Sequence, residues 1–226
     1  MLKIEKFVTA SPEQWEIIIE GMRNPMNSWE KMDSDTCMDY GECGFKSGCR
    51  YDGCYKIGEN DHSLMMRLAN GGSVHAKYRR MIPVWVTLTA PLYWWKEFDT
   101  YKVGTVANSC STMHKIQAKE FTLEDFSCEH LNLISKDYLL DTIRQLNACR
   151  NDFLSTKDKR HWWQLIQLLP TSYNQKRTVM LNYEVLHNIY ESRKNHKLDE
   201  WHVFCDWIES LPYSEIIIGE KEATNA

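Results

Sequence analysis

The segment 169–193, LPTSYNQKRTVMLNYEVLHNIYESR, constrains the fold more than any other part of the chain. A Leu-Pro pair ends the preceding element, a polar turn follows, and the pattern then favours a helix over 178–194. At ~100° per residue, four side chains of such a helix fall on nearly one line: Asn182, Leu186, Ile189 and Arg193. An arginine on an apolar face needs an anionic partner, because an unpaired buried charge is very costly. The pattern therefore predicts a helix that forms one wall of a ligand site.

The rest of the chain mixes strand-like and helix-like patterns. Leu2–Thr9 alternates as a strand does, and Ser11–Met22 reads as a helix that opens with a capping box. Ile82–Leu92, rich in β-branched and aromatic residues, is the clearest strand. Further elements are expected as helices at 61–71 (capped by Asp61), 135–156, 161–169 and 198–210, a helix and a loop around Gly104 within 92–120, and a tail strand at 214–219. The sequence predicts an α+β fold: a single domain over 1–226 with an antiparallel or mixed sheet packed by helices, and an irregular Cys-rich loop at about 26–60.

Composition narrows the function classes. The 226 residues are enough for one sizeable core, and 43% of them are hydrophobic, nine being Trp. With 27 Lys+Arg against 31 Asp+Glu, the net charge of −4 argues against a broad nucleic-acid-binding surface, although a single nucleotide needs only a few local cations. No apolar stretch reaches the ~20 residues of a membrane span, and the N-terminus lacks the apolar core of a signal peptide. We expect a cytoplasmic protein with reduced thiols.

Two segments resemble a known family. Counted from the Leu of Leu-Pro, the thirteenth residue on is Asn182, the nineteenth Asn188 and the twenty-fourth Arg193. In the segment 82–114, Ala90-Pro91 ends a strand, and Asn108, Ser111 and His114 follow at fixed intervals; Gly72 and His75 precede the same strand. These spacings are similar to those of the flavin-dependent thymidylate synthase family. The chain is therefore identified as a divergent member of that family, with the resemblance covering 72–114 and 162–212.

The chain also departs from the family's signature, R-H-R-x-x-S-x-N-E-x-S-x-R-Y. The R-H-R triplet is replaced by Thr100-Tyr101-Lys102 or by Tyr101-Lys102-Val103, depending on a one-residue slip. The first signature Ser is Val106, the Glu is Ser109 and the last Arg is Met113. A further family Arg before Leu-Pro falls near Ile166 or Gln167. Several cations that hold phosphates in the family are therefore missing.

The resemblance implies a function and a set of site residues. It implies FAD as cofactor, a pyrimidine deoxynucleotide such as dUMP as substrate, NADPH and methylenetetrahydrofolate as co-substrates, and a homotetramer with active sites between subunits. It makes Arg193 and Ser111 the expected catalytic residues, both in contact with the nucleotide. The expected cofactor-binding residues are His75, Lys102, Asn108, Asn182 and Asn188, and Lys96 is expected to add substrate-binding charge. No protein nucleophile is implied, and no metal.

Other interpretations stay open. The helix could simply turn its Asn and Arg to water, and the turn around Asn108 and Ser111 could be a capped turn without a ligand. The protein could also be a retasked or non-catalytic nucleotide-binding protein that lost the R-H-R signature. A zinc-stabilised interaction protein is a third reading, although the gaps in the cysteine cluster do not match structural zinc pairs. Its members are Cys37, Cys43, Cys49 and Cys54, with His62 downstream.

Overall fold

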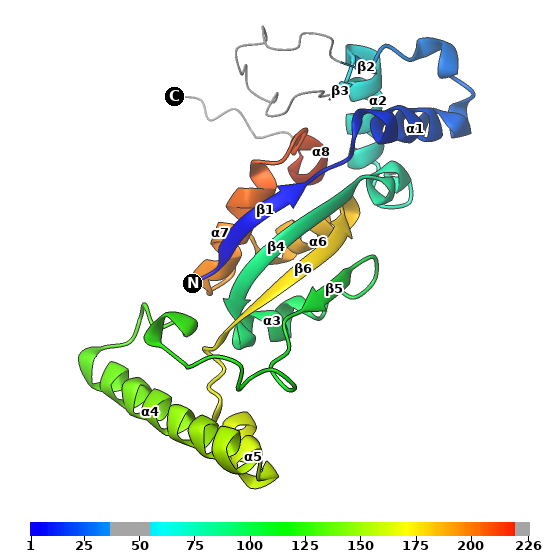
Figure 1. The fold of residues 1–226 in the computed structure, drawn as a ribbon. Helices are drawn as coiled ribbons and strands as arrows, with labels where there is room; N and C mark the ends of the chain where they lie inside the picture. Colours follow the sequence, from blue (N-terminus) through cyan, green and yellow to red (C-terminus); the bar gives the residue numbers. More distant parts are fainter. Residues whose placement is uncertain (37–54, 220–226) are drawn as a thin grey trace, which may run out of the picture. The chain divides into compact units, whose positions relative to one another are not determined.

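A computed structural model describes residues 1–36 and 55–219 and confirms the predicted α+β class (Figure 1). The strands are β1 (Lys3–Val8), β2 (Asp35–Thr36), β3 (Tyr55–Lys56), β4 (Pro83–Pro91), β5 (Val106–Ser109) and β6 (Asn174–Asn182). The α-helices are α1 (Pro12–Arg23), α2 (Glu59–Asn70), α3 (Leu92–Phe98), α4 (Leu133–Thr156), α5 (Lys159–Leu168), α6 (Tyr183–Arg193), α7 (Asp199–Glu209) and α8 (Glu215–Ile218). Short 3₁₀ turns are η1 (Asn24–Met26), η2 (Trp29–Lys31), η3 (Lys77–Met81) and η4 (Leu123–Asp125).

The chain forms two compact units that interleave along the sequence. One unit contains residues 1–6, 87–100 and 107–179, and the other contains 7–86, 101–106 and the chain from 180 onward. We call them the first and the second unit. Because β4 and β6 each supply residues to both, neither unit is a continuous stretch of sequence. The single domain expected from the sequence stays a prediction.

The main sheet has the strand order β1-β4-β6-β5. The Leu92 N–H donates to the Tyr173 carbonyl at 3.0 Å, and the Tyr183 N–H donates to the Ile82 carbonyl at 3.1 Å. These bonds place the start of β6 opposite the end of β4, so the two strands are antiparallel. One side of β4 is buried, as the period of two in the sequence predicts: Val84, Val86, Leu88 and Ala90.

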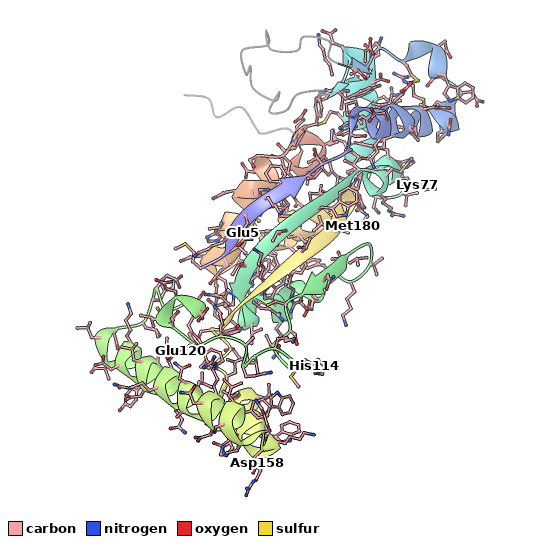
Figure 2. All side chains as sticks on the ribbon, viewed as in Figure 1. Glu5, Lys77, His114, Glu120, Asp158 and Met180 are labelled. Atoms are coloured by element: carbon pink, nitrogen blue, oxygen red, sulfur yellow. The ribbon has the colours of Figure 1, made fainter. Side chains whose placement is uncertain are left out.

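The first unit packs helices against its part of the sheet and around a separate core. In α3, Trp94, Trp95 and Phe98 are buried, and the Trp95 Nε1–H donates to the Gln175 carbonyl of β6 at 2.9 Å. Helices α4 and α5 pack against each other over an apolar cluster that includes Leu146 and Leu165. The segment between β5 and α4, which carries His114 and Glu120, lacks long regular elements (Figure 2).

The second unit contains α1, α2, α6, α7 and α8. The predicted capping box of α1 is confirmed: Ser11 Oγ accepts from the Gln14 N–H, and Gln14 Oε1 accepts from the Ser11 N–H. Helix α6 packs against η3, α7 and α8. In this unit a buried ion pair joins α1 to α2, with Arg23 Nε 2.6 Å from Asp61 Oδ1.

Two predicted boundaries are wrong in the C-terminal part. The helix predicted over 178–194 begins only at Tyr183, because 174–182 is strand β6. In β6 the buried residues Gln175, Val179 and Leu181 lie on one side of the strand, with the half-buried Arg177 between them, and the helical period obscured that alternation. The tail strand predicted at 214–219 is helix α8, in which Gly219 N–H donates to the Glu215 carbonyl at 2.9 Å. Burial of Ile216 and Ile217 explains their apolar, strand-like composition.

The role predicted for Asp61 is also wrong. It lies inside α2 and does not cap it; Gly58 is the N-cap residue. Its carboxylate instead accepts hydrogen bonds from Arg23, from the Asp33 N–H and from the N–H and hydroxyl of Ser34. Asp61, in the first turn of α2, is therefore the centre of a buried polar network and not the cap of the helix.

Some expectations concern parts of the chain outside the described residues. Cys37, Cys43, Cys49 and Cys54, the proposed metal cluster, all lie there. His62 is described, and its Nε2 lies 2.8 Å from Glu215 Oε1. Within residues 1–36 and 55–219, none of the helices has both the length and the apolar character needed to cross a bilayer.

The Asp61 network yields a stability prediction. Asp61→Asn should lower the free energy of unfolding by about 3–5 kcal/mol at neutral pH, because it leaves the Arg23 charge buried without its carboxylate. Urea unfolding measures this loss. Asp141→Asn, which alters an exposed carboxylate paired with Arg144, is the matched control and should change the free energy of unfolding by less than about 1 kcal/mol.

The stability that Asp61 contributes to the fold should depend on pH. Burial alone would raise the pKa of Asp61, but the hydrogen bonds from Ser34, Asp33 and Arg23 outweigh it, so its pKa is lowered. A lowered pKa stabilises the fold above the ordinary Asp value of about 3.9, and this stabilisation is lost as pH falls through the folded-state value. The difference in free energy of unfolding between wild type and Asp61→Asn should therefore become smaller in acid. A constant gap from pH 7 downward would contradict this account.

Candidate functional site

Helix α6 and the loop 101–106 form the candidate site in the second unit. Asn182, the last residue of β6, is the N-cap of α6, and its Oδ1 accepts from the Val185 N–H at 3.1 Å. Gly104 in the loop has φ +80°, and a Cβ built there would lie 3.2 Å from Asn182 Nδ2 and 3.1 Å from Val185 Cγ2. The loop thus lies directly on the Asn182 amide. Because a glycine has no Cβ, it can adopt the left-handed conformation and also allow this close approach of the loop backbone to Asn182.

Arg193 lies at the other end of α6, among aromatic rings. Its Nε–H donates to Tyr101 Oη at 2.9 Å. Its Cζ lies 4.7 Å from the centroid of the Trp201 ring and 5.6 Å from that of Tyr101. The two rings meet edge-to-face, with centroids 6.2 Å apart. The guanidinium is therefore held by a hydrogen bond and by cation–π contacts, in a side chain that remains partly exposed.

Buried contacts fix the position of α6. Arg79 Nε lies 2.8 Å from Glu184 Oε2, with side-chain exposures of 2% and 8%, in the geometry of an ion pair and not of an aligned hydrogen bond. Arg79 Nη1 donates to the Ile216 carbonyl at 3.3 Å, and the Tyr183 hydroxyl donates to the Pro212 carbonyl at 2.6 Å. Burial raises the pKa of Tyr183 far above its ordinary value, so its hydroxyl stays protonated. The start of α6 is thereby anchored to η3 and to the segment around α8.

The other predicted residues of this unit are more exposed. Asn188 lies on α6 but on an exposed part of it, whereas Leu186 and Ile189 are buried. His75 is exposed in the turn that precedes η3, and its N–H donates to the Gly72 carbonyl. Lys102 is exposed in the loop. Asn182 and Arg193 contact the loop 101–106, through Gly104 and Tyr101 respectively.

The remaining predicted residues belong to the first unit. Asn108 is exposed in β5, and Lys96 is exposed in α3. Ser111 Oγ accepts from the Met113 N–H at 3.3 Å and from the His114 N–H at 2.8 Å. This is the local turn that a serine hydroxyl commonly makes, as the alternative interpretation expected. A ligand role for these three residues stays a prediction.

Two partners of Arg193 were not singled out from the sequence as site residues. The sequence marks Tyr101 only as a replacement within the R-H-R triplet, and Trp201 only as one of nine Trp. The sequence feature that could have pointed to Tyr101 is its position within the triplet that is R-H-R in the resembling family. The pairing itself joins residues 92 positions apart, which no local pattern reveals.

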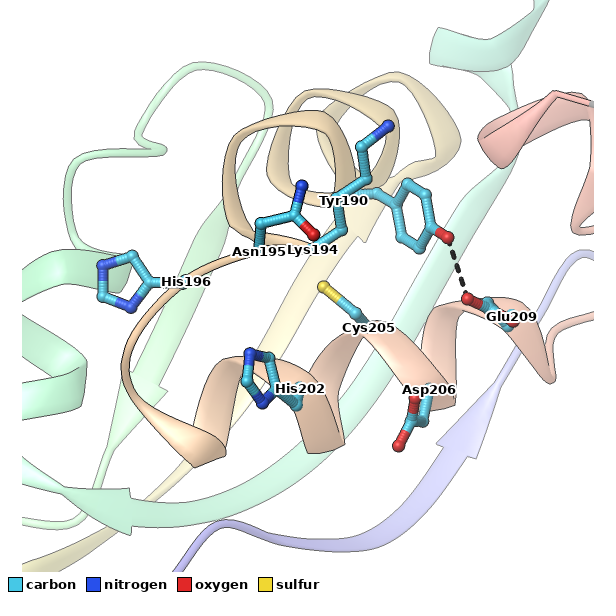
Figure 3. A pocket seen from close by; sticks show the side chains of 8 residues that line it. All are labelled: Tyr190, Lys194, Asn195, His196, His202, Cys205, Asp206 and Glu209. Carbon is cyan, nitrogen blue, oxygen red and sulfur yellow. Dashed lines mark hydrogen bonds between the residues drawn. The ribbon is translucent and has the colours of Figure 1, made fainter.

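A shallow pocket of about 660 Å³ lies where α6 ends and α7 passes (Figure 3). Its lining residues are Tyr190, Lys194, Asn195, His196, His202, Cys205, Asp206 and Glu209. The Tyr190 hydroxyl donates to Glu209 Oε1 at 2.8 Å. Burial raises the pKa of the Cys205 thiol to about 12, so it is a poor nucleophile at neutral pH. None of the predicted site residues lines this pocket.

A metal centre finds no support in the described residues. Across 1–36 and 55–219, no three His, Cys, Asp or Glu side chains gather closely enough to hold an ion.

Comparison with known proteins gives a fold relationship. No family model matches the sequence, and no curated protein sequence matches it. Thymidylate synthase X (ThyX) from Helicobacter pylori, solved with FAD and dUMP, superposes with a TM-score of 0.62 at 14% identity, covering 97% of this chain and 96% of that one. A second structure of the flavin-dependent H. pylori enzyme, also complexed with FAD and dUMP, gives 0.60 at 14% identity, with 97% of each chain covered.

A third similar structure is the UMP/dUMP methylase PolB from Streptomyces cacaoi bound with 5-Br dUMP. It gives a TM-score of 0.54 at 10% identity and covers 96% of this chain and 93% of that one. The likeness therefore extends over nearly the whole length of both partners. The chain has the fold of these proteins.

Proposed function

We propose that the protein binds FAD and a pyrimidine deoxynucleotide and catalyses the flavin-dependent methylation of dUMP to dTMP, with methylenetetrahydrofolate and NADPH as co-substrates. The observation that carries the proposal is the pair of polar groups on α6: the Asn182 amide and the Arg193 guanidinium, both held by the loop 101–106. The fold also supports the proposal, because it resembles structures solved with FAD and dUMP over 97% of this chain.

The Asn182 side chain suits the edge of a flavin ring. Its Oδ1 is engaged by the Val185 N–H, so the cap fixes the orientation of the amide. The Nδ2 group is a donor only, and the carbonyl oxygens and ring nitrogens of a flavin are acceptors. Lys102, exposed in the neighbouring loop, would add a point cation for phosphate, and Asn188 and His75 are further candidates. When bound, a reduced flavin is the source of the hydride in this chemistry.

Arg193 would bind and polarise the nucleotide. A guanidinium forks onto a phosphate, or donates to the oxygen atoms of a uracil edge, and in either place it stabilises negative charge. Its contacts with Tyr101 and Trp201 hold it in place before the ligand arrives. The protein's contribution is then positioning and electrostatics, without a nucleophile. Ser111 and Lys96 remain expected nucleotide contacts, Asn108 an expected flavin contact, and the homotetramer an expected assembly.

A second function has one observation in its favour. The positions of the R-H-R triplet hold Thr100-Tyr101-Lys102 or Tyr101-Lys102-Val103, and in either register they supply one cation where the family carries several. A protein that keeps the nucleotide site but binds no flavin would fit this loss. Such a protein would be a retasked, non-catalytic nucleotide-binding protein on the same fold.

Spectroscopy and complementation separate the two functions. We expect the purified protein to take up FAD, shown by the visible flavin spectrum after gel filtration, and to restore growth of a thymidine-requiring bacterium without added thymidine. Colourless protein that binds dUMP in calorimetry and fails to complement would favour the second function. Protein that binds neither FAD nor dUMP would contradict both.

Asn182 can be tested without disturbing its helix. Asn182→Asp keeps an oxygen for the Val185 N–H and places a negative charge at a helix start, so the free energy of unfolding should be unchanged or slightly higher. The lost N–H donor should weaken FAD binding by about tenfold, the value of one hydrogen bond in a polar site. FAD titration followed by flavin fluorescence measures the affinity. Equal FAD affinities of variant and wild type would remove Asn182 from the flavin site.

Arg193 should be needed for nucleotide binding. Arg193→Ala should weaken dUMP binding by about 10–100-fold, because charge-assisted hydrogen bonds are lost. Arg193→Lys keeps the charge but not the fork, and should recover part of the affinity. Calorimetry with dUMP and with deoxyuridine distinguishes a phosphate contact, which affects only dUMP, from a uracil contact, which affects both. Arg144→Ala, on the exposed surface of α4, is the control. Unchanged dUMP affinity of Arg193→Ala would exclude this role.

A further inference from the structure

We propose that Tyr101 is a positioning residue for Arg193, the expected nucleotide contact. This inference rests on the proposed function, since it assigns Tyr101 a task in nucleotide binding. Tyr101 itself need not touch the ligand.

The hydrogen bond between the two side chains has a defined direction. A guanidinium has only donors, so the phenol oxygen must accept from Arg193 Nε, which lies 2.9 Å away. Nε is the guanidinium nitrogen nearest the aliphatic stem. The guanidinium is planar and rigid, so a bond at this atom restrains the orientation of the whole group.

Aromatic contacts restrict the same group further. The Trp201 ring, fully buried in α7, lies 4.7 Å from Arg193 Cζ and meets the Tyr101 ring edge-to-face. Trp201 thus supplies a surface that cannot move away, and Tyr101 supplies the acceptor that fixes the orientation on it. An arginine side chain loses much rotamer freedom when it binds a ligand. Holding it beforehand removes that cost from the binding step.

The loop that carries Tyr101 is itself fixed. Three residues after Tyr101, Gly104 packs on Asn182 and Val185 in a backbone conformation that disfavours other residues. The loop therefore contacts α6 near its start through Gly104 and near its end through Tyr101. At roughly 1.5 Å per residue, the eleven residues of α6 give the helix a length of about 16 Å. One short loop thereby sets the positions of both polar groups on the helix.

Tyr101→Phe tests the proposal, because it removes the acceptor and keeps the ring. We expect dUMP to bind about tenfold more weakly, as for the loss of one charge-assisted hydrogen bond. In an Arg193→Ala background, the same change should have no further effect on dUMP affinity. The Arg193 Nε–H, assigned by ¹⁵N NMR, should exchange with water faster in Tyr101→Phe than in wild type. Loss of overall stability alone would produce neither the coupling nor the local exchange.

Tyr78→Phe is the matched control. The Tyr78 hydroxyl donates to the Met65 carbonyl at 2.9 Å in the same unit, so the variant loses a phenol hydrogen bond of equal length away from Arg193. It should leave dUMP affinity unchanged. If wild type binds dUMP and Tyr101→Phe binds it equally well, or if the losses from Tyr101→Phe and Arg193→Ala simply add, the positioning role is overturned. If wild type itself binds no dUMP, the proposed function fails, and this role fails with it.

Discussion

The antiparallel pairing of β4 with β6 is the constraint on which the rest of the structure depends. The two strands lie far apart in sequence, and each supplies residues to both compact units. Their pairing ends at Tyr183, whose N–H bonds to the Ile82 carbonyl and whose side chain begins α6. The place where the strand ends is therefore also the place where the candidate site begins. A shift of one residue in this register would turn the side chain of Asn182 to the opposite side of the strand.

Helix α6 connects this packing to the proposed chemistry. Its inner side is held by Leu186, Ile189 and the Arg79–Glu184 ion pair. Its ends carry the two polar groups that the loop 101–106 contacts. Rigid support of this kind is what an electrostatic site needs, because a donor that must reorganise during the reaction contributes less.

The sequence was sufficient for most elements and for part of the site. Local signals were reliable where one pattern dominated, as in the capping box at Ser11 and the β-branched and aromatic composition of β4. They failed at 174–182, where a two-residue period runs directly into a helical one and Asn182 belongs to both elements. They failed also at Asp61, because the acidic residue near a helix start had a distant partner, Arg23. Spacing proposed Asn182 and Arg193 as candidates, but their surroundings depend on Tyr101, Gly104 and Trp201, which only the folded chain brings near.

The left-handed glycine in the loop has a consequence for tracing related proteins. Between Tyr101 and Gly104, Lys102 and Val103 point to solvent, and Val103 is 92% exposed. Substitutions at those two positions should destabilise the fold little. A side chain at Gly104 would be strained by the left-handed backbone and would crowd the Asn182 amide. Chains that share this arrangement should thus keep a tyrosine and a glycine three residues apart, with two variable positions between them.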